Sequence, residues 1–442
     1  MTNHANPNTS LLAPYFQRLE FLSTARWHGR VTKAVGHIVE SEGPLCSLGE
    51  CCEIFGPDGE GHAGEVVGFR GRTVLSMPLE RLNGIRYGDR IAAWGAKPTL
   101  RVSQELLGRV IDGEGKPLDS QPDYMASEYQ RLHASGPLPL ARQSIRQPLG
   151  CGVRSIDAFL TCGRGQRIGI FGGSGVGKST LLGLMARGSA ADVTVMGLIG
   201  ERGREVREFL EGTLGEEGRR RSVVVVSTSD QSPLLRIRAA LVATTVAEYF
   251  AHQGKHVLLV VDSLTRFAMA QREIGLAAGE PPTAKGYTPS VFTLLAQLIE
   301  RAGNFDGGSI TAFYTVLMEG DDQQDPLVDA VRSLLDGHVV LDRRLASQGH
   351  YPPVSILDSL SRLMPAVCTP EHLDKVRRLR RLLAAYAASE DLIRVGAYQK
   401  GLDPVLDQAI EITPAVAKFL QQRADEKAPL ATTLTALQAL PG

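Results

Sequence analysis

Strongly apolar segments alternate with helical segments through the middle of the chain, from about residue 150 to residue 365. Each apolar segment is short enough for a buried strand, and the stretch after it carries apolar residues at helical spacing. This alternation predicts a parallel sheet with crossover helices, and therefore an α/β fold. The predicted strands are 166–171, 193–199, 222–226, 256–261, 309–315 and 338–341.

The pattern differs over residues 27–97, where short β-rich segments are separated by turns such as Gly56-Pro57-Asp58-Gly59. Closely spaced short strands with Gly, Pro and Asp turns predict a small β-barrel. A barrel that binds nucleic acid needs stacking aromatics and a basic groove. Residues 29–95 hold only Phe55, Phe69, Tyr87 and Trp94 as aromatics, and their acids and bases are interspersed. A structural collar is therefore the favoured interpretation.

Three further segments complete the organisation of the chain. Residues 107–118 read as a strand-turn unit leading out of the barrel, and the Pro- and Gln-rich residues 119–150 as a wrapping linker. Residues 14–22 predict a short amphipathic helix that packs on its own domain or docks onto a partner or a membrane surface. The predicted domains are 1–26 (partner-binding segment), 27–98 (barrel), 99–365 (ATP-binding core) and 366–442 (helical domain).

The chain is helical from Pro370 onward, with one apolar stripe and one basic face. The stripe comprises Leu373, Val376, Leu379, Leu382, Leu383 and Tyr386. The opposite face carries Lys375, Arg377, Arg378, Arg380 and Arg381. A solvated surface is the favoured interpretation of this basic face, with contact to a partner or to nucleic acid as the alternative.

Composition narrows the function classes. The 442 residues contain 48 Lys and Arg against 48 Asp and Glu, so no global field recruits nucleic acid or an anionic membrane. The six cysteines show no metal-ligand spacing, which is typical of reduced thiols in a cytoplasmic protein. The polar first ten residues lack the apolar core of a signal peptide, and no apolar run is long enough to span a bilayer.

A glycine-rich motif between the first two core elements carries the chemistry. Residues 172–180 read G-x-x-x-x-G-K-S-T, after a predicted strand and before a predicted helix. In this setting the motif predicts a phosphate loop whose backbone N–H groups face a nucleoside triphosphate, with a lysine on the β- and γ-phosphates and a hydroxyl on Mg²⁺. The predicted ATP-binding residues are Gly173, Ser174, Gly175, Val176, Gly177, Lys178, Ser179 and Thr180, and Ser179 is also a predicted metal ligand.

Charged residues at the ends of later strands supply the rest of the predicted site. Asp262 follows four apolar residues at the end of a strand, and is expected to hold Mg²⁺ through water or Ser179. Glu201 lies just after the predicted strand 193–199 and is predicted to polarise the attacking water. Glu205 is the alternative for this role, but it lies about one turn further along the chain and is less favoured. Its neighbour Arg202 is included among the catalytic residues. Arg362 is either a surface arginine or a cation for a neighbouring subunit's nucleotide.

Several motifs resemble the catalytic subunits of rotary ATPases, and most closely the ATPases of type III protein export systems. They are Gly-Glu-Arg-Gly-Arg-Glu-Val at 200–206, Asp-Ser-Leu-Thr-Arg-Phe-Ala at 262–268, Gly-Tyr-Thr-Pro-Ser at 286–290 and His-Tyr-Pro-Pro at 350–353. The stretch 228–236 favours the flagellar branch over the virulence-secretion branch. The resemblance covers roughly residues 27–442.

The resemblance implies a six-stranded-type barrel, a RecA-like core and a C-terminal helical domain, assembled as a homohexamer. It implies that Arg362 is a trans arginine finger and that Tyr351 packs on adenine. It also implies a stator-like negative regulator on the N-terminal segment, export chaperone–substrate complexes, a membrane export gate and a central coiled-coil stalk protein. The loops 275–287 and 319–326 are candidates to line the ring's centre, and the protein is expected in the cytoplasm, peripherally at the inner membrane.

Other functions remain to be weighed against an export ATPase. A hexameric RNA translocase is disfavoured by the aromatic-poor barrel and the zero net charge, so no nucleic-acid partner is expected. A non-catalytic ring subunit is disfavoured by the presence of Glu201. Proton-coupled ATP synthesis needs a membrane rotor that one soluble chain does not supply.

Overall fold

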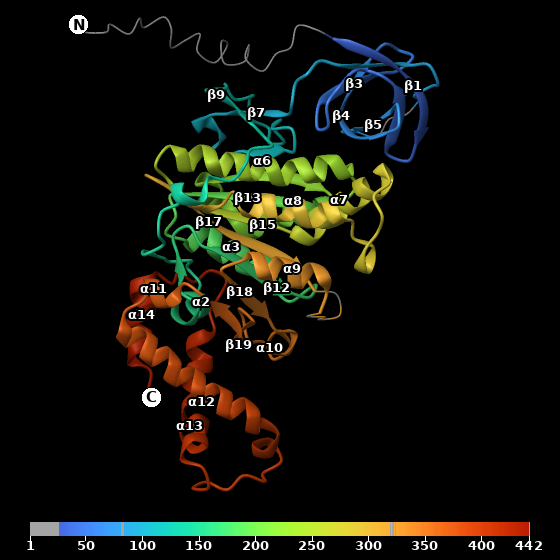
Figure 1. Cartoon of the computed structure of the whole chain (residues 1–442). Helices are drawn as coiled ribbons and strands as arrows, with labels where there is room; N and C mark the ends of the chain where they lie inside the picture. The colour runs from blue at the N-terminus through green and yellow to red at the C-terminus, as the bar shows by residue number, and fades with distance from the viewer. Residues whose placement is uncertain (1–25, 81–83, 319, 321, 323, 442) are drawn as a thin grey trace, which may run out of the picture.

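The computed structural model describes residues 26–441, apart from 81–83, 319, 321 and 323. The predicted helix at 14–22 lies outside the described residues, as does nearly all of the predicted N-terminal segment. Three regions follow along the chain: a barrel, an α/β core and a helical end (Figure 1). The predicted fold class, a P-loop core with an N-terminal barrel and a C-terminal helical domain, is confirmed.

The N-terminal region is a closed barrel of antiparallel strands in the order β1-β2-β5-β4-β3-β6. Its interior holds small and medium apolar side chains, among them Val31, Ile54, Val66 and Ile91. The strands alternate inward apolar and outward polar residues, which is the pattern that predicted them. They are β1 Trp27–Val35, β2 Ile38–Glu42, β3 Cys51–Phe55, β4 Gly61–Arg70, β5 Thr73–Pro78 and β6 Arg90–Ala93.

The barrel is joined to the core by a buried ion pair. Arg238 of α6 (Pro233–His252) donates to Glu65 Oε2 of β4 over 2.9 Å, and both side chains are buried. Burial alone raises the carboxyl pKa of Glu65, but Arg238 and His133 outweigh it and the net pKa is lowered. Ser232 adds a hydrogen bond to the Leu79 carbonyl oxygen. The collar therefore rests on the core through specific polar contacts.

The core is a nine-stranded sheet in the order β19-β18-β12-β17-β15-β13-β14-β8, with β16 beside β17. Most neighbours are parallel, and all six predicted strands are present, several of them longer by one or two residues at the end. The strands are β8 Val110–Asp112, β12 Arg167–Gly172, β13 Val193–Glu201, β14 Ser222–Thr228, β15 His256–Asp262, β16 Gly303–Asn304, β17 Ser309–Leu317, β18 Gly337–Leu341 and β19 Val354–Ser361.

Two expectations about the sheet are corrected. The sheet is not wholly parallel, because β19 returns antiparallel beside β18 and β16 is antiparallel to β17. The 107–118 unit does not simply leave the barrel: its apolar Val110 and Ile111 are buried by pairing with β14, which makes β8 the edge strand of the core. Neither pairing has a local sequence signal, because partners of short strands are chosen by tertiary packing.

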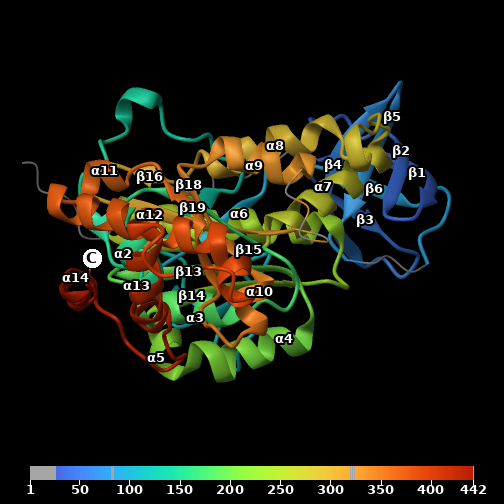
Figure 2. The same ribbon diagram turned by 90° about the horizontal axis from the view of Figure 1, so that it is seen from below.

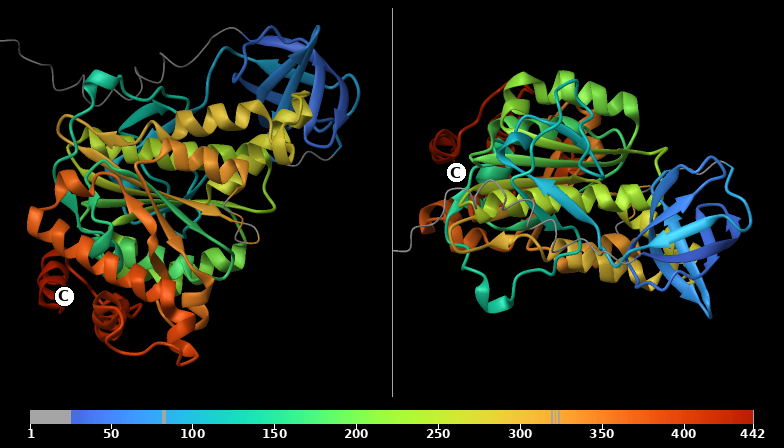
Figure 3. Two further views of the ribbon diagram at one scale, coloured as in Figure 1. Left: turned by 60° about the horizontal axis from the view of Figure 1, so that its bottom comes forward. Right: turned by 90° about the horizontal axis from the view of Figure 1, so that it is seen from above.

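Helices cover both faces of the sheet (Figures 1 and 3). One apolar cluster unites α6 with α7, α8 and α9 on one face. A second cluster unites α2 and α3 with the C-terminal helices on the other face. The core helices are α2 Arg154–Phe159, α3 Lys178–Gly188, α4 Gly203–Glu208, the π-helical η3 Phe209–Leu214, α5 Gly215–Arg220, α6, α7 Leu264–Ala278, α8 Pro289–Ile299, α9 Pro326–Leu334, α10 Arg343–Ser347 and α11 Met364–Val367.

The predicted linker 119–150 wraps around the core with little structure of its own. Its two strands pair with strands outside the linker in small two-stranded sheets: β9 Glu128–Arg131 with β7 Thr99–Val102, and β10 Pro148–Leu149 with β11 Cys162–Gly163. The linker also holds the 3-10 turn η2 Pro139–Ala141, and two further 3-10 turns, η1 Gln104–Leu106 and η4 Ala284–Gly286, lie outside it.

The C-terminal region packs α12 Pro370–Arg394 antiparallel to α13 Pro404–Leu420, followed by α14 Leu430–Ala439. The predicted apolar stripe of α12 faces this packing. Its basic face is only partly solvated. Arg380 donates to the Phe159 and Ser359 carbonyl oxygens, and Lys375 donates to the Leu440 carbonyl oxygen. Long basic side chains reach the carbonyl groups of neighbouring segments, which helical periodicity does not reveal.

Candidate active site

The loop between β12 and α3 has the backbone that a phosphate site requires. Gly175 and Gly177 have φ angles of 78° and 89°, in the left-handed region that favours glycine. Helix α3 begins at Lys178, directly after Gly177, so its first N–H groups face the loop. The predicted ATP-binding residues 173–180 therefore lie together at the positive end of an eleven-residue helix.

Lys178 meets the acid that was predicted about eighty residues further along the chain. Its Nζ lies 3.3 Å from Asp262 Oδ1, and the two side chains are 12% and 6% exposed. Thr315 Oγ1 donates to the same carboxylate oxygen over 2.5 Å. Asp262 ends β15, and only β17 stands between β15 and β12 in the sheet. The order of the strands therefore brings lysine and aspartate together.

A cavity of about 170 Å³ opens beside this pair, between the strand ends and the α4–η3 segment. It is lined by Ser179, Glu201, Glu205 and Asp262 among others. One hydroxyl and one carboxylate oxygen are the protein ligands that Mg²⁺ accepts when a nucleotide's phosphates supply the rest. The donor set present here therefore fits Mg²⁺ bound together with ATP.

Glu201 occupies the last position of β13 and reaches the same cavity. Burial is the largest cause that raises its carboxyl pKa, to about 7, and the negative charge of Asp262 and a hydrogen bond with Glu205 add to it. Lys178 and Arg266 act in the opposite direction. A carboxyl that titrates near neutral pH is suited to accept a proton from water.

The two arginines near Glu201 take different positions. Arg202, a predicted catalytic residue, has an exposed side chain that pairs with Glu205 over 3.5 Å and is not among the residues that line the cavity. Arg266 was not predicted: its side chain passes 3.1 Å from where a Cβ on Gly200 would lie, and its charge lowers the pKa of Glu201. Its signal was the position four residues after Asp262, in the first turn of α7.

A larger hollow of about 820 Å³ lies on the other side of the phosphate loop. The ring of Tyr351 stands there, 3.4 Å from where a Cβ on Gly177 would lie. The C-terminal residues 421–424 also line this hollow, and Gln422 N–H donates to the Tyr351 carbonyl oxygen over 2.9 Å. The predicted aromatic is thus beside the loop, while the C-terminal wall was missed because no local pattern connects residues so far apart.

Arg362 is the one predicted site residue that lies far from the phosphate loop. It follows β19, and its N–H donates to the Asp336 carbonyl oxygen, while Asp336 N–H donates to the Arg167 carbonyl oxygen. Arg167 begins β12, whereas the phosphate loop starts at the other end of that strand. Five residues of strand, about 17 Å, separate the two ends. The exposed Arg362 therefore lies at the opposite end of the sheet from its own chain's phosphate loop.

The two loops predicted to line a ring's centre contact each other. Lys285 Nζ lies 2.9 Å from both Asp322 Oδ2 and Asp325 Oδ2. Their role at a centre stays a prediction. No helix in the described part of the chain is long and apolar enough to cross a membrane.

Comparison with known proteins gives the family. The nucleotide-binding domain of the ATP synthase alpha/beta family matches residues 152–361, and the β-barrel domain of that family matches residues 31–95. The chain belongs to the ATP synthase alpha/beta family. Residues 368–439 match the C-terminal domain of the type III secretion ATPase EscN. The predicted resemblance and ATPase class are confirmed.

Full-length relatives narrow the group within this family. The chain is 50% identical to the flagellum-specific ATP synthase of Salmonella typhimurium, over 100% of the chain and 99% of the relative. It is 47% identical to the type 3 secretion system ATPase of Xanthomonas euvesicatoria, over 98% of each. The structure of the assembled ATPase EscN from enteropathogenic E. coli aligns with a TM-score of 0.87 and 44% identity, over 93% of this chain and 99% of that one.

Proposed function

We propose that this protein is a Mg²⁺-dependent ATP hydrolase that energises type III export of flagellar proteins as a homohexameric ring. The observation that carries the ring is the separation of Glu201 and Arg362 in one chain. Glu201 lies beside the phosphate loop, and Arg362 lies at the other end of the sheet. In a ring of identical copies, heterologous contacts set one copy's Arg362 against the next copy's phosphate loop.

Each residue then has a defined task. Lys178 and the loop N–H groups hold the β- and γ-phosphates, and Ser179 and Asp262 hold Mg²⁺, which neutralises phosphate charge when bound. Glu201 orients the attacking water and accepts its proton. The positive charge of Arg266 lowers the pKa of the Glu201 carboxyl and so favours its ionised form. Arg362 of the neighbouring copy stabilises the charge that develops on the γ-phosphate. Arg202 pairs with Glu205, which lines the same cavity as Glu201, and we propose that it reaches the phosphates only when this ion pair opens.

The proposed partners follow from the relatives. A solved relative is the assembled EscN in complex with its central stalk EscO, with a TM-score of 0.86 and 44% identity. We extend this to a central coiled-coil stalk for the present protein, together with a regulator at the N-terminal segment, chaperone–substrate complexes and a membrane export gate. The proposed location is cytoplasmic, peripherally associated with the inner membrane.

One alternative has specific support: an ATPase of a virulence-type secretion injectisome. The chain is 47% identical to the Xanthomonas secretion ATPase and 50% identical to the Salmonella flagellar relative. These two sequence identities are too similar to separate the two systems. Deletion of the gene separates the two: loss of flagellar filaments supports the flagellar system, and normal filaments with lost effector secretion support the injectisome.

The ring is tested by ATP hydrolysis per chain over a wide range of protein concentration, for the wild type and Arg362→Ala. We expect specific activity to climb with concentration for the wild type as rings assemble. The variant should stay near the dilute rate, about 10³-fold or more below the assembled wild type, while binding nucleotide normally. A concentration-independent wild-type rate would show that each site is complete within one chain.

A further inference from the structure

A short apolar arm projects from the linker, drawn in turquoise (Figures 2 and 3). Its tip is Pro137-Leu138-Pro139-Leu140, in which Leu138 is 76% and Leu140 is 100% exposed. Two prolines fix φ, and the 3-10 turn η2 closes the tip. The arm therefore presents its leucines in a fixed conformation, at little entropic cost to a binding partner.

Both ends of the arm are anchored to the core. Arg142 donates to the Ala302 carbonyl oxygen over 2.8 Å, to the Glu300 carbonyl oxygen, and to Glu300 Oε2 over 2.8 Å. Gly136 lies so near that a Cβ there would come within 2.9 Å of the Glu300 carbonyl oxygen. Gln143 N–H donates to the Asn304 carbonyl oxygen over 2.9 Å. Both ends of the arm therefore contact the segment 300–304, and most of these contacts involve Glu300.

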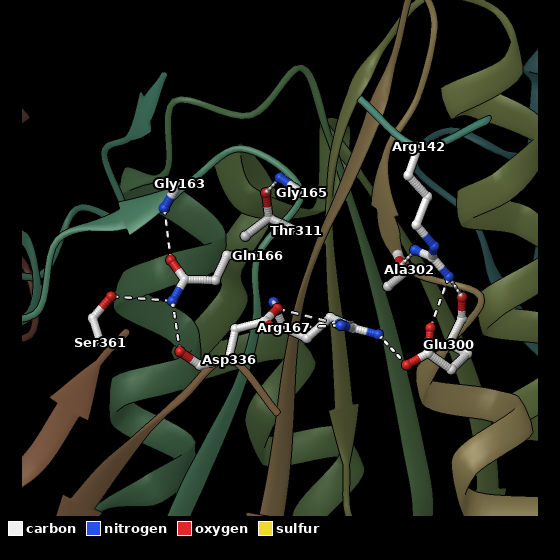
Figure 4. A network of polar contacts seen from close by, with 10 residues as sticks. All are labelled: Arg142, Gly163, Gly165, Gln166, Arg167, Glu300, Ala302, Thr311, Asp336 and Ser361. Carbon is white, nitrogen blue, oxygen red and sulfur yellow. Dashed lines mark hydrogen bonds and ion pairs between the residues drawn. The ribbon is translucent and has the colours of Figure 1, made fainter. Parts of the chain in front are cut away.

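Glu300 connects the arm to the base of β12 (Figure 4). Its two carboxylate oxygens accept from two arginines: Oε2 from Arg142, and Oε1 from Arg167 over 2.6 Å. Arg167 also donates to Asp336, whose carbonyl oxygen accepts the N–H of Arg362. One chain of polar contacts therefore runs from the arm to the backbone of Arg362.

We propose that the leucine arm docks onto the neighbouring copy of this chain in the ring, and that the Arg142–Glu300–Arg167–Asp336 contacts use this docking to position Arg362. The proposal rests on the proposed ring. It adds an interface element and a positioning path, both at the same end of the sheet as Arg362.

Three observations favour a second copy as the occupant. The arm shares its end of the sheet with Arg362, so a neighbour that receives Arg362 also faces the arm. Residues 135–141 contain no charged side chain, which suits an apolar protein surface and gives nothing to attract phosphate or an anionic lipid. A structural relative that aligns over nearly its whole length is described as assembled.

The docking is tested with the double variant Leu138→Ser/Leu140→Ser, in the full chain with Mg²⁺ and a non-hydrolysable ATP analogue. Both side chains are exposed in the single chain, so the variant should fold and bind nucleotide like the wild type. We expect the protein concentration for half-maximal assembly, followed by sedimentation velocity and by specific ATPase activity, to rise at least about tenfold. Leu402→Ser, which alters a leucine 72% exposed in the α12–α13 loop, is the matched control and should assemble normally.

An unchanged assembly midpoint in the double variant overturns the docking while leaving the ring intact. If the wild type itself shows no concentration dependence, the proposed ring fails, so the two failures are distinguishable. Recovery of assembly by Leu138→Met/Leu140→Met supports apolar contact as the cause. If the double variant assembles normally but no longer binds an isolated export chaperone, the arm docks a different protein and the proposal is overturned.

The positioning path is tested separately with Glu300→Gln. The Glu300 side chain is 47% exposed, so its ion pairs add little to stability and the fold should persist. We expect kcat at saturating protein concentration to fall about fivefold or more, with the KM for ATP within about twofold, because Arg362 acts only in the transition state. A wild-type kcat in fully assembled Glu300→Gln rings overturns the path.

Discussion

The two ends of the core sheet differ in how they are built. At the carboxyl ends of the strands, one continuous motif supplies the phosphate loop, and two strand-terminal acids complete the pocket. The groups at the amino ends come from separate parts of the chain: Arg362, Arg167, Glu300 and the apolar arm. Ion pairs and backbone hydrogen bonds connect them. The first end forms a pocket within one chain, whereas the second presents Arg362 and the arm outward.

This difference shows how one fold can supply both halves of a catalytic site. Strand ends that carry loops and helix N-termini bind anions within the chain. Arg362 lies at the opposite end of the sheet from its own chain's phosphate loop, so in the proposed ring it would act on another copy's nucleotide. Identical copies arranged head to tail thereby repeat a complete site at every interface.

The largest expected effect comes from mixing two inactive variants, one for each end of the sheet. Lys178→Ala and Arg362→Ala should each lose nearly all ATP hydrolysis alone. In mixed rings, an Arg362→Ala chain keeps its phosphate loop and can receive Arg362 from a Lys178→Ala neighbour. Random mixing makes about a quarter of interfaces complete, so the mixture should recover about that fraction of wild-type activity in a steady-state assay. No recovery despite subunit exchange would place both residues in one chain's site.

The next effect concerns the acids at the carboxyl ends. Glu201→Gln should lower kcat by about 10²–10⁴-fold, because it removes the proton acceptor. In the wild type, kcat/KM should fall as pH is lowered through about 7, where the carboxyl of Glu201 becomes protonated. Glu205→Gln removes a contact that raises the pKa of Glu201, so this acidic limb should move to lower pH with kcat largely kept.

A larger loss of kcat in Glu205→Gln than in Glu201→Gln would contradict the role given to Glu201 and make Glu205 the better candidate for the catalytic carboxylate. An acidic limb that Glu205→Gln leaves in place would show that the contact with Glu205 does not raise the pKa of Glu201.

The smallest effect is expected at Tyr351, beside the phosphate loop. Stacking on a base contributes about 1–3 kcal/mol, so Tyr351→Ala should raise the KM for ATP about tenfold and leave kcat nearly unchanged. Tyr351→Phe keeps the ring and should behave like the wild type. A Phe variant as impaired as Ala would mean that the hydroxyl group, and not the ring, is used.

Much of the fold was accessible from local patterns. The apolar segments predicted the six core strands, and the alternation of short strands with turns predicted the barrel, because both are determined by which side chains must be buried. Predictions failed where partners are set by packing: the antiparallel β19, the edge strand β8, and the contacts of Lys375 and Arg380 with carbonyl oxygens of other segments.

The sequence by itself determined the phosphate loop, since its glycines, lysine and hydroxyl must be adjacent for one backbone turn to surround a phosphate. It also placed Asp262 and Glu201 at strand ends, which a parallel sheet gathers on one edge. Only the tertiary structure decided that Lys178 meets Asp262, that Arg266 stands beside Glu201, and that Arg362 lies a full strand length from its own chain's phosphate loop. Strand order and direction fix these distances, and both are set by the burial of the whole sheet between its helices.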